Sequence, residues 1–407
     1  MEKEGANEDD SKSNKVDRFD VESVAQANGG QNNDHGLTSA HTIDHDSWKQ
    51  VGVLLVTTFN CGYILTFSNL MLVPLGWSWG VVCLILVGIF AAYANWLLAG
   101  FHIIGGQRFI RYRDLMGFVF GEYFQITPVS STYTDTKRNV LPHMGPAVFD
   151  PSAWEHGLYP SWWKSTQGKT NKDRDYNIKG SQADKVFHAF GAIAAILVCN
   201  TSGLLPEIQS TLRKPVVKNM RKALYVQYTI GLGIYYGVSI VGYWAYGSSV
   251  SEYLPKELSG PKWGRVLINA MVFLQAVVSQ HMFIAPIHEA LDTKFLKPGE
   301  KMYSTNNLKR LFVLRALLFT VNTFITAAFP FMGDFVNLLG SFTLFPLTFV
   351  FPSMIFLKVK GNSARFDQKV WHWSNIVLFS LLAVITTVSA VRLIVNNAKM
   401  YNFFADT

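Results

Sequence analysis

FHAFGAIAAILVCNTSGLLPE, residues 187–207, is an apolar run of membrane-spanning length that is interrupted in its middle. Small and polar residues replace bulky apolar ones at 199–203, and Gly203 and Pro206 weaken the helical backbone there. In lipid every backbone polar group must be satisfied, so such a break persists only where it is buried or lines a cavity. The pattern predicts a broken transmembrane helix of the kind that binds small solutes. The alternative is a kinked packing helix whose Ser and Thr bond their own backbone.

A second interruption, TTFNCGY at residues 57–63, lies in the first apolar run of the chain. Two broken helices in separate parts of a chain are typical of inverted-repeat carriers, where half-helix ends meet the substrate. Ordinary packing of small residues between helices is the alternative interpretation. The same caution applies to Gly233 and Gly237, whose spacing could allow close helix contact.

The composition indicates a membrane protein. Charged residues make up only 16% of the 407 residues, whereas soluble domains average about 25%. None of them occurs between Gln50 and Gln107. Apolar length predicts eight spans, at residues 52–73, 79–101, 187–205, 223–246, 266–287, 311–331, 335–357 and 373–395. We therefore expect an all-α polytopic membrane protein. The first 46 residues are polar without apolar periodicity, which predicts a disordered cytosolic tail before a membrane domain at 47–407.

The stretch from Glu122 to Lys185 breaks this pattern. It contains five prolines and the charged run 169–174, and no window of about 18 apolar residues fits inside it. Four basic clusters, at 108–113, 213–222, 294–310 and 358–369, should all be cytosolic. With a cytosolic N-terminus and only the eight predicted spans, the last three clusters would face outward. An odd number of additional crossings between Arg113 and Phe187 would remove the conflict, so charge parity points to missing helices.

Ionisable residues inside or beside spans are functional candidates by default. Glu207 and His281 are the two proton-coupling candidates. The alternative for His281 is a structural role, as a buried histidine whose ring nitrogens are hydrogen-bonded. Enzymatic motifs are lacking: His288-Glu289 begins a metalloprotease-like pattern, but Asp292 stands where the second His ligand belongs. We expect no enzyme, no metal, no cofactor and no nucleic-acid partner. Oligomeric state is not addressed by the sequence.

Several long stretches resemble the proline and compatible-solute transporter subgroup of the amino acid/auxin permease family. They include DSWKQVGVLLVTTFNCGYILTFSNLMLVPLGWSWG, FHAFGAIAAILVCNTSGLLPEIQSTLRKPVVKNMRKALY and VSQHMFIAPIHEALDTKF. The resemblance covers residues 46–122 and 173–407. It implies a LeuT-like inverted-repeat fold of about eleven helices, with this chain lacking the third to fifth. Unrelated polar sequence at about 123–171 replaces these three helices, leaving about eight spans.

The resemblance also implies a function. We expect a plasma-membrane, proton-coupled symporter with a cytosolic N-terminus, which imports proline, with glycine betaine and 4-aminobutyrate as further candidates. Its partners would be the amino acid or compatible solute, protons and the lipid bilayer, with the proton gradient as driving force. The alternative is a non-transporting splice variant, an altered gene model or a regulatory membrane protein derived from such a carrier. Substrate binding is carried over to Phe59, Asn60, Cys61, Gly62, Tyr63, Cys199, Asn200, Thr201, Ser202 and Gly203.

Overall fold

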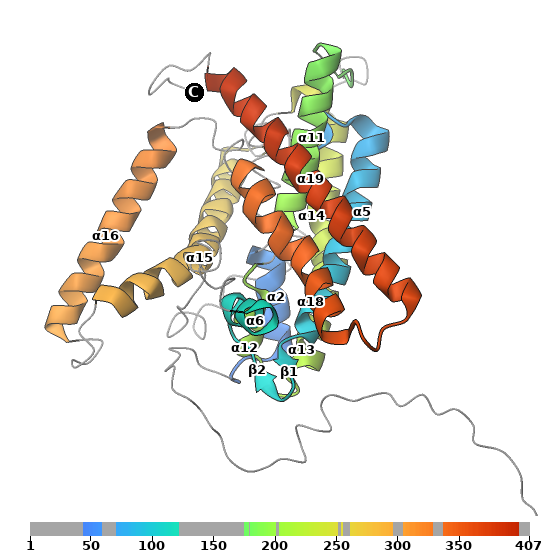
Figure 1. Ribbon diagram of the computed structural model, residues 1–407. Coiled ribbons are helices and arrows are strands. Elements are labelled where there is room, and N and C mark those ends of the chain that lie inside the picture. The colour runs from blue at the N-terminus through green and yellow to red at the C-terminus, as the bar shows by residue number, and fades with distance from the viewer. Residues whose placement is uncertain are drawn as a thin grey trace, which may run out of the picture.

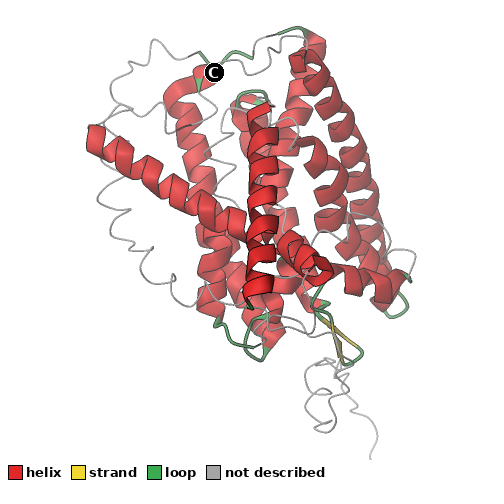
Figure 2. Ribbon diagram, turned by 90° about the vertical axis from the view of Figure 1, so that its left-hand side faces the viewer, coloured by secondary structure: helices red, strands yellow, loops and turns green. Residues whose placement is uncertain are grey.

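The computed structural model describes residues 44–58, 71–121, 175–178, 180–200, 203–250, 254, 261–295, 304–328 and 337–398. Helices form nearly all of this part of the chain, with a short antiparallel strand pair (Figures 1 and 2). The elements are α2 (Trp48–Thr58), α5 (Gly76–Gly100), β1 (Ile103–Ile104), β2 (Gln107–Arg108), α6 (Tyr112–Phe120), α11 (Gln182–Cys199), α12 (Leu205–Ser210), α13 (Val216–Val226), η3 (Gln227–Gly231), α14 (Leu232–Tyr246), η4 (Gly247–Ser249), α15 (Lys262–Phe295), α16 (Thr305–Ala328), η6 (Gly340–Leu344), η7 (Pro346–Val350), α18 (Phe351–Lys360) and α19 (Phe366–Ala398).

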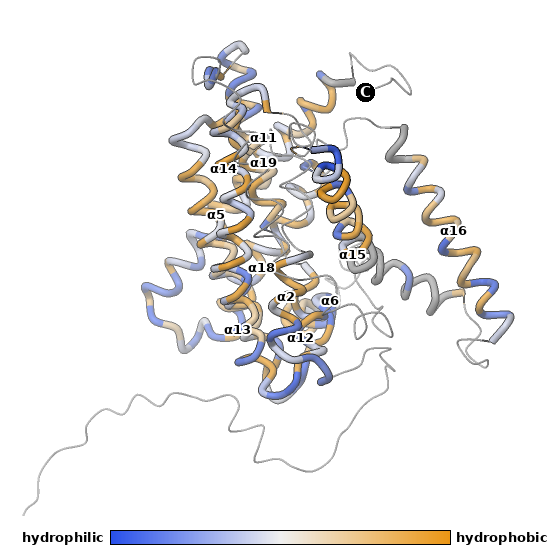
Figure 3. The backbone as a smooth tube through the Cα atoms, turned by 180° about the vertical axis from the view of Figure 1, so that it is seen from behind, coloured by the Kyte–Doolittle hydropathy of each residue, from blue (hydrophilic) through white to orange (hydrophobic). Residues whose placement is uncertain are grey.

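The expectation of an all-α, multi-spanning protein is confirmed. Within the described ranges, five helices are long and apolar enough to cross a membrane: Gly76–Gly100, Gln182–Cys199, Val216–Ser249, Asn337–Lys360 and Phe366–Asn396. All eight predicted spans overlap helices. Besides the five helices above, α2 coincides with the start of the first predicted span, and α15 and α16 coincide with the fifth and sixth predicted spans. Apolar residues dominate the helix middles, while hydrophilic residues gather at the turns (Figure 3).

The ends of α5 fix the direction of its neighbour α11. At the start of α5, the Trp77 ring lies 6.0 Å from that of Tyr176, which precedes α11. At the other end, Nε2 of Gln209 in α12 donates to the carbonyl of Ala99 at 2.9 Å. Helix α5 and the pair α11–α12 therefore run side by side in the same direction.

This parallel alignment puts the two sides of the atypical stretch at opposite ends of the bundle. Asp175 is tied to the end of α14, because its carbonyl accepts from the amide of Ser248 at 2.7 Å. Gly121 ends α6, which is held at the other end through Phe118, whose ring lies 4.9 Å from that of Phe109. The chain between Gly121 and Asp175 therefore connects opposite ends of the bundle, which is the geometry that charge parity requires.

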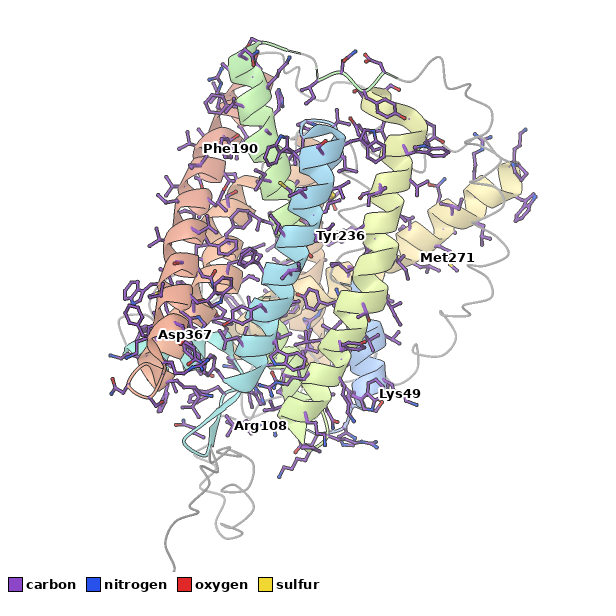
Figure 4. The ribbon with its side chains drawn as sticks, turned by 90° about the vertical axis from the view of Figure 1, so that its right-hand side faces the viewer. Lys49, Arg108, Phe190, Tyr236, Met271 and Asp367 are labelled. Atoms are coloured by element: carbon purple, nitrogen blue, oxygen red, sulfur yellow. The ribbon has the colours of Figure 1, made fainter. Side chains whose placement is uncertain are left out.

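Three basic clusters, at 108–113, 213–222 and 358–369, lie at the end at which α5 finishes, where the Arg221 guanidinium lies 5.0 Å from the Trp96 ring. Arg108 and Lys49 lie there, and so does Asp367 at the start of α19 (Figure 4). Arg108 is the centre of the contacts between segments: its Nη2 donates to the carbonyl of Ser210 at 2.8 Å and to the Asp44 carboxylate at 3.2 Å. The Asp46 amide donates to the carbonyl of Thr211 at 2.8 Å. Residues 44–46, at the edge of the predicted tail, are thus bonded to the end of α12.

His102 is buried beneath this network. It is 2% exposed, and its Nε2 accepts a hydrogen bond from Nε of Arg108 at 3.0 Å. Desolvation and the neighbouring Arg108 charge lower the pKa of His102 to about 3. A folded-state pKa below the unfolded value of about 6.5 means that the unfolded chain binds the proton first. The stabilising contribution is therefore complete above about pH 6.5 and is lost as the pH falls toward 3.

Lowering the pH from 7 to 5 should therefore cost on the order of 2 kcal/mol of folding free energy through His102 alone. Thermal unfolding of the purified protein in detergent at both pH values measures this loss. The H102Q variant, which cannot take up the proton, should lose visibly less stability on acidification. H45Q is the matched control at an exposed histidine. Equal acid sensitivity of wild type and H102Q would contradict the assignment.

Close helix packing depends on Gly340, at the start of η6. A Cβ atom at this position would overlap Cγ2 of Val198, close to the end of α11. Gly233 and Gly237 are different, because no described atom lies within 4 Å of a Cβ built on either. The possible close helix contact at these two glycines is therefore not made within the described part of the chain, whose helix α14 leaves that face open.

We expect G340A to lower stability by roughly 1–3 kcal/mol, because the added methyl group must displace Val198 or the helix that carries it. Thermal unfolding in detergent measures the effect, and G233A is the control with open space around the new methyl group. The double variant G340A/V198A should lose less stability than the sum of the losses in G340A and V198A, because the smaller side chain at 198 makes room for the new methyl group. Equal melting temperatures for G340A and G233A would show that the two helices do not touch here.

Candidate functional site

The predicted interruption of the third span is a real end of a helix. Helix α11 begins at a capped N-terminus, where Oγ of Ser181 accepts from the amide of Asp184 at 3.2 Å. It ends at Cys199, and the next helix, α12, begins only at Leu205 with Pro206 in its first turn. Pro is compatible with a first turn but not with a helix interior, so α12 starts anew instead of continuing α11.

Asn200 closes the end of α11. Its backbone amide donates to the carbonyl of Leu197 at 3.0 Å, and its side-chain Nδ2 donates to the carbonyl of Ile196 at 2.8 Å. The residue is only 4% exposed. The last carbonyls of a helix carry partial negative charge and lack partners within the helix. The break therefore has a buried carbonyl-rich end where a cationic group such as an ammonium is favoured.

Tyr236 of α14 completes this end of the site. Nδ2 of Asn200 donates to its hydroxyl at 3.1 Å, and the hydroxyl lies 3.3 Å from Oδ1 of Asn200. A second tyrosine in the same helical run, Tyr228, accepts a hydrogen bond from Nδ2 of Asn95 on α5. Polar side chains from α5, the end of α11, η3 and α14 are thus paired with one another inside an otherwise apolar bundle.

The stretch that begins with η6 also packs against the end of α11. Gly340 faces Val198, two residues before Asn200, and the neighbouring Ser341 is completely buried. Within the described ranges, Oγ of Ser341 has no hydrogen-bond partner. In the described part of the chain, η3, η6 and η7 have the wide π-helical geometry, which is frequent at functional sites.

The structure places only part of the predicted binding set. Cys199, 3% exposed, and Asn200 lie together at the end of α11, and Gly203 lies in the turn before α12. Thr201, Ser202 and the first predicted break, with Phe59, Asn60, Cys61, Gly62 and Tyr63, lie outside the described residues. The substrate-binding roles of the whole set stay predictions.

The two proton-coupling candidates are separated by sequence and by element. Glu207 is a half-buried residue in the first turn of α12, directly beyond the break. His281 is carried by α15, but its side chain lies outside the described part of the structure. Helix α15 reaches the first span through Gln275, whose Nε2 donates to the carbonyl of Thr57 at 3.2 Å. The coupling roles are not tested by this geometry.

Tyr236, Tyr228, Asn95 and Gly340 were not predicted from the sequence. A hydroxyl-bearing ring or an amide within an apolar helix is a signal that such a residue has a partner, because a buried polar tip needs a hydrogen bond. The sequence does not reveal which partner. Asn95 and Tyr228 are 133 residues apart, and Asn200 and Tyr236 are 36 apart.

Comparison with known proteins matches the chain in two parts, one on each side of the middle of the atypical stretch. The family described as "Transmembrane amino acid transporter protein" matches residues 44–134 and 162–393, which leaves 135–161 unmatched. "GABA transporter 1" of Arabidopsis thaliana is 34% identical over 246 residues, which are 58% of this chain and 54% of that protein. "Lysine histidine transporter-like 1" of the same plant is 24% identical over 387 residues, 81% of this chain and 84% of that protein.

The alignment with GABA transporter 1 thus spans about half of that relative's length, and "Lysine histidine transporter-like 6", 26% identical over 255 residues, is aligned over 56% of its own. These relatives and the family are transporters and not enzymes, as we expected. The family match covers both parts of the chain that flank the atypical stretch, including α11, the break and α14. The chain belongs to the transmembrane amino acid transporter family, as a multi-pass membrane protein.

Proposed function

We propose that this chain is a proton-coupled symporter that imports proline, glycine betaine or 4-aminobutyrate across the plasma membrane. The observation that carries the proposal is the buried end of α11 at Cys199 and Asn200, which a separate short helix, α12, follows. Membership of an amino acid transporter family gives the substrate class. The name of GABA transporter 1 supports 4-aminobutyrate as one candidate.

The break suits the charged amine end that proline and 4-aminobutyrate share. The negative end of the α11 dipole favours an ammonium over a carboxylate, by roughly 0.3–1 kcal/mol at exposed sites and more where partly buried. We propose that the substrate amine approaches these carbonyls and that residues of the first predicted break complete the site. A LeuT-like inverted-repeat arrangement of about eight spans, with the third to fifth helices of the family replaced, is part of the same proposal.

Proton coupling is assigned to Glu207, with His281 as second candidate. Glu207 lies on the half-helix that follows the break, so a change in its charge acts on the element that must move if the site is to open. The positive-inside rule favours a cytosolic location for the basic end of the bundle, which includes Arg108 and the bonded residues 44–46. The N-terminus would then be cytosolic.

Uptake of labelled proline, 4-aminobutyrate and glycine betaine into a yeast strain deficient in all three tests the proposal. We expect uptake above the vector control, faster at external pH 5 than at pH 7, and abolished by a protonophore. E207Q should transport with little dependence on the proton gradient, whereas D367N, at an exposed carboxylate, should behave as wild type. Lysine and histidine, tested in parallel, would reveal the specificity suggested by the names of the other relatives.

A non-transporting membrane protein is the second candidate. It is favoured by one observation: the stretch that must connect opposite ends of the bundle contains no apolar window of spanning length. Absence of uptake for every substrate, with surface expression confirmed by labelling, would reject the active carrier and favour this reading. Sequencing the transcript across codons 122–171 would then distinguish a true variant from an altered gene model.

A further inference from the structure

Tyr236 is a half-buried residue near the start of α14 and lies close to α5 (Figure 4). Among the described residues, its hydroxyl accepts a hydrogen bond from the amide nitrogen of Asn200 and donates one to the amide oxygen of the same side chain. The tyrosine therefore reaches from a continuous helix to the first residue after a broken one. A continuous helix is the more rigid support of the two.

The position of the Tyr236 ring depends on a glycine in the neighbouring helix. A Cβ built on Gly88 of α5 would lie 3.2 Å from the Tyr236 hydroxyl and 2.7 Å from Cδ2 of Leu232. Both distances are shorter than ordinary van der Waals contact. The small residue therefore allows α14 to approach α5 closely enough for the hydroxyl to meet Asn200.

The hydrogen bonds of Asn200 show what the tyrosine controls. A carboxamide nitrogen has two protons to donate. One is directed to the carbonyl of Ile196 and the other to the Tyr236 hydroxyl. With both protons committed, the carboxamide is held in one orientation over the end of α11. Without the hydroxyl, it is free to turn and to cover different carbonyls.

We propose that Tyr236 is a positioning residue for the amine-binding end of the break: it holds the Asn200 carboxamide and thereby sets which α11 carbonyls face the substrate. This inference rests on the proposed function, and it names a residue of the same site that contacts Asn200 and not the substrate. A preorganised site binds more tightly because less ordering is required on binding. The effect should appear in KM and leave the maximal rate nearly unchanged.

The chemistry of the substrates sharpens this expectation. Proline and 4-aminobutyrate carry N–H groups that can donate to helix carbonyls, whereas the quaternary ammonium of glycine betaine carries none. In Y236F the KM for the two N–H substrates should rise about three- to tenfold, the equivalent of one lost hydrogen bond. The KM for glycine betaine should change by less than twofold. Y93F, which removes a part-buried hydrogen bond between α5 and His372 of α19, is the matched control outside the site and should leave all three unchanged.

A second measurement does not depend on transport. Cys199 is buried directly before Asn200, so its rate of reaction with a small maleimide reports whether the end of α11 is closed. In a C61S/C83S background, Y236F should raise this rate several-fold over the background protein, and Y93F should not. An unchanged rate in Y236F, or an equal rise in both variants, overturns the proposal even if the wild-type chain transports nothing. Uptake by the wild type with an unchanged KM in Y236F overturns it while leaving the proposed function intact.

Discussion

The parallel alignment of α5 with α11–α12 is the constraint on which the rest of this structure depends. It is set at one end by the aromatic contact between Trp77 and Tyr176 and at the other by the hydrogen bond from Gln209 to Ala99. Two neighbouring helices that run in the same direction must be connected by a chain that returns along the bundle. All basic clusters can then share one end, and the break in α11 lies between the ends, where lipid would otherwise surround it.

A broken helix within a membrane is stable only if its free carbonyl and amide groups have partners. Here Asn200 supplies some of them from within the chain, and Tyr236 keeps Asn200 in place. Gly88 and Gly340 make the arrangement possible, because side chains at these positions would push α14 and η6 away from the break. The site is therefore a product of close packing by small residues as much as of its polar groups.

Much of this was predictable from local sequence. Apolar length predicts helices at all eight expected spans, because a span must satisfy its own backbone and therefore shows itself in composition. The end of α11 was predictable because Gly203 and Pro206 act locally on the backbone. Tyr236 and Gly340 were not, because their importance arises from partners far away in the chain. The hydrogen bond between the backbones of Asp46 and Thr211 was not predicted for the same reason. The polar tail has no sequence periodicity that would indicate such a contact.

The central claim is that the basic end and the end near Asp175 face opposite sides of the membrane, with the break of α11 between them. Single cysteines at Gln107 and at Asn177, both exposed positions, test it in a background without native cysteines. A membrane-impermeant maleimide applied to intact cells should label the cysteine at 177, and the cysteine at 107 only after permeabilisation. Labelling of both positions from the same side would contradict the account.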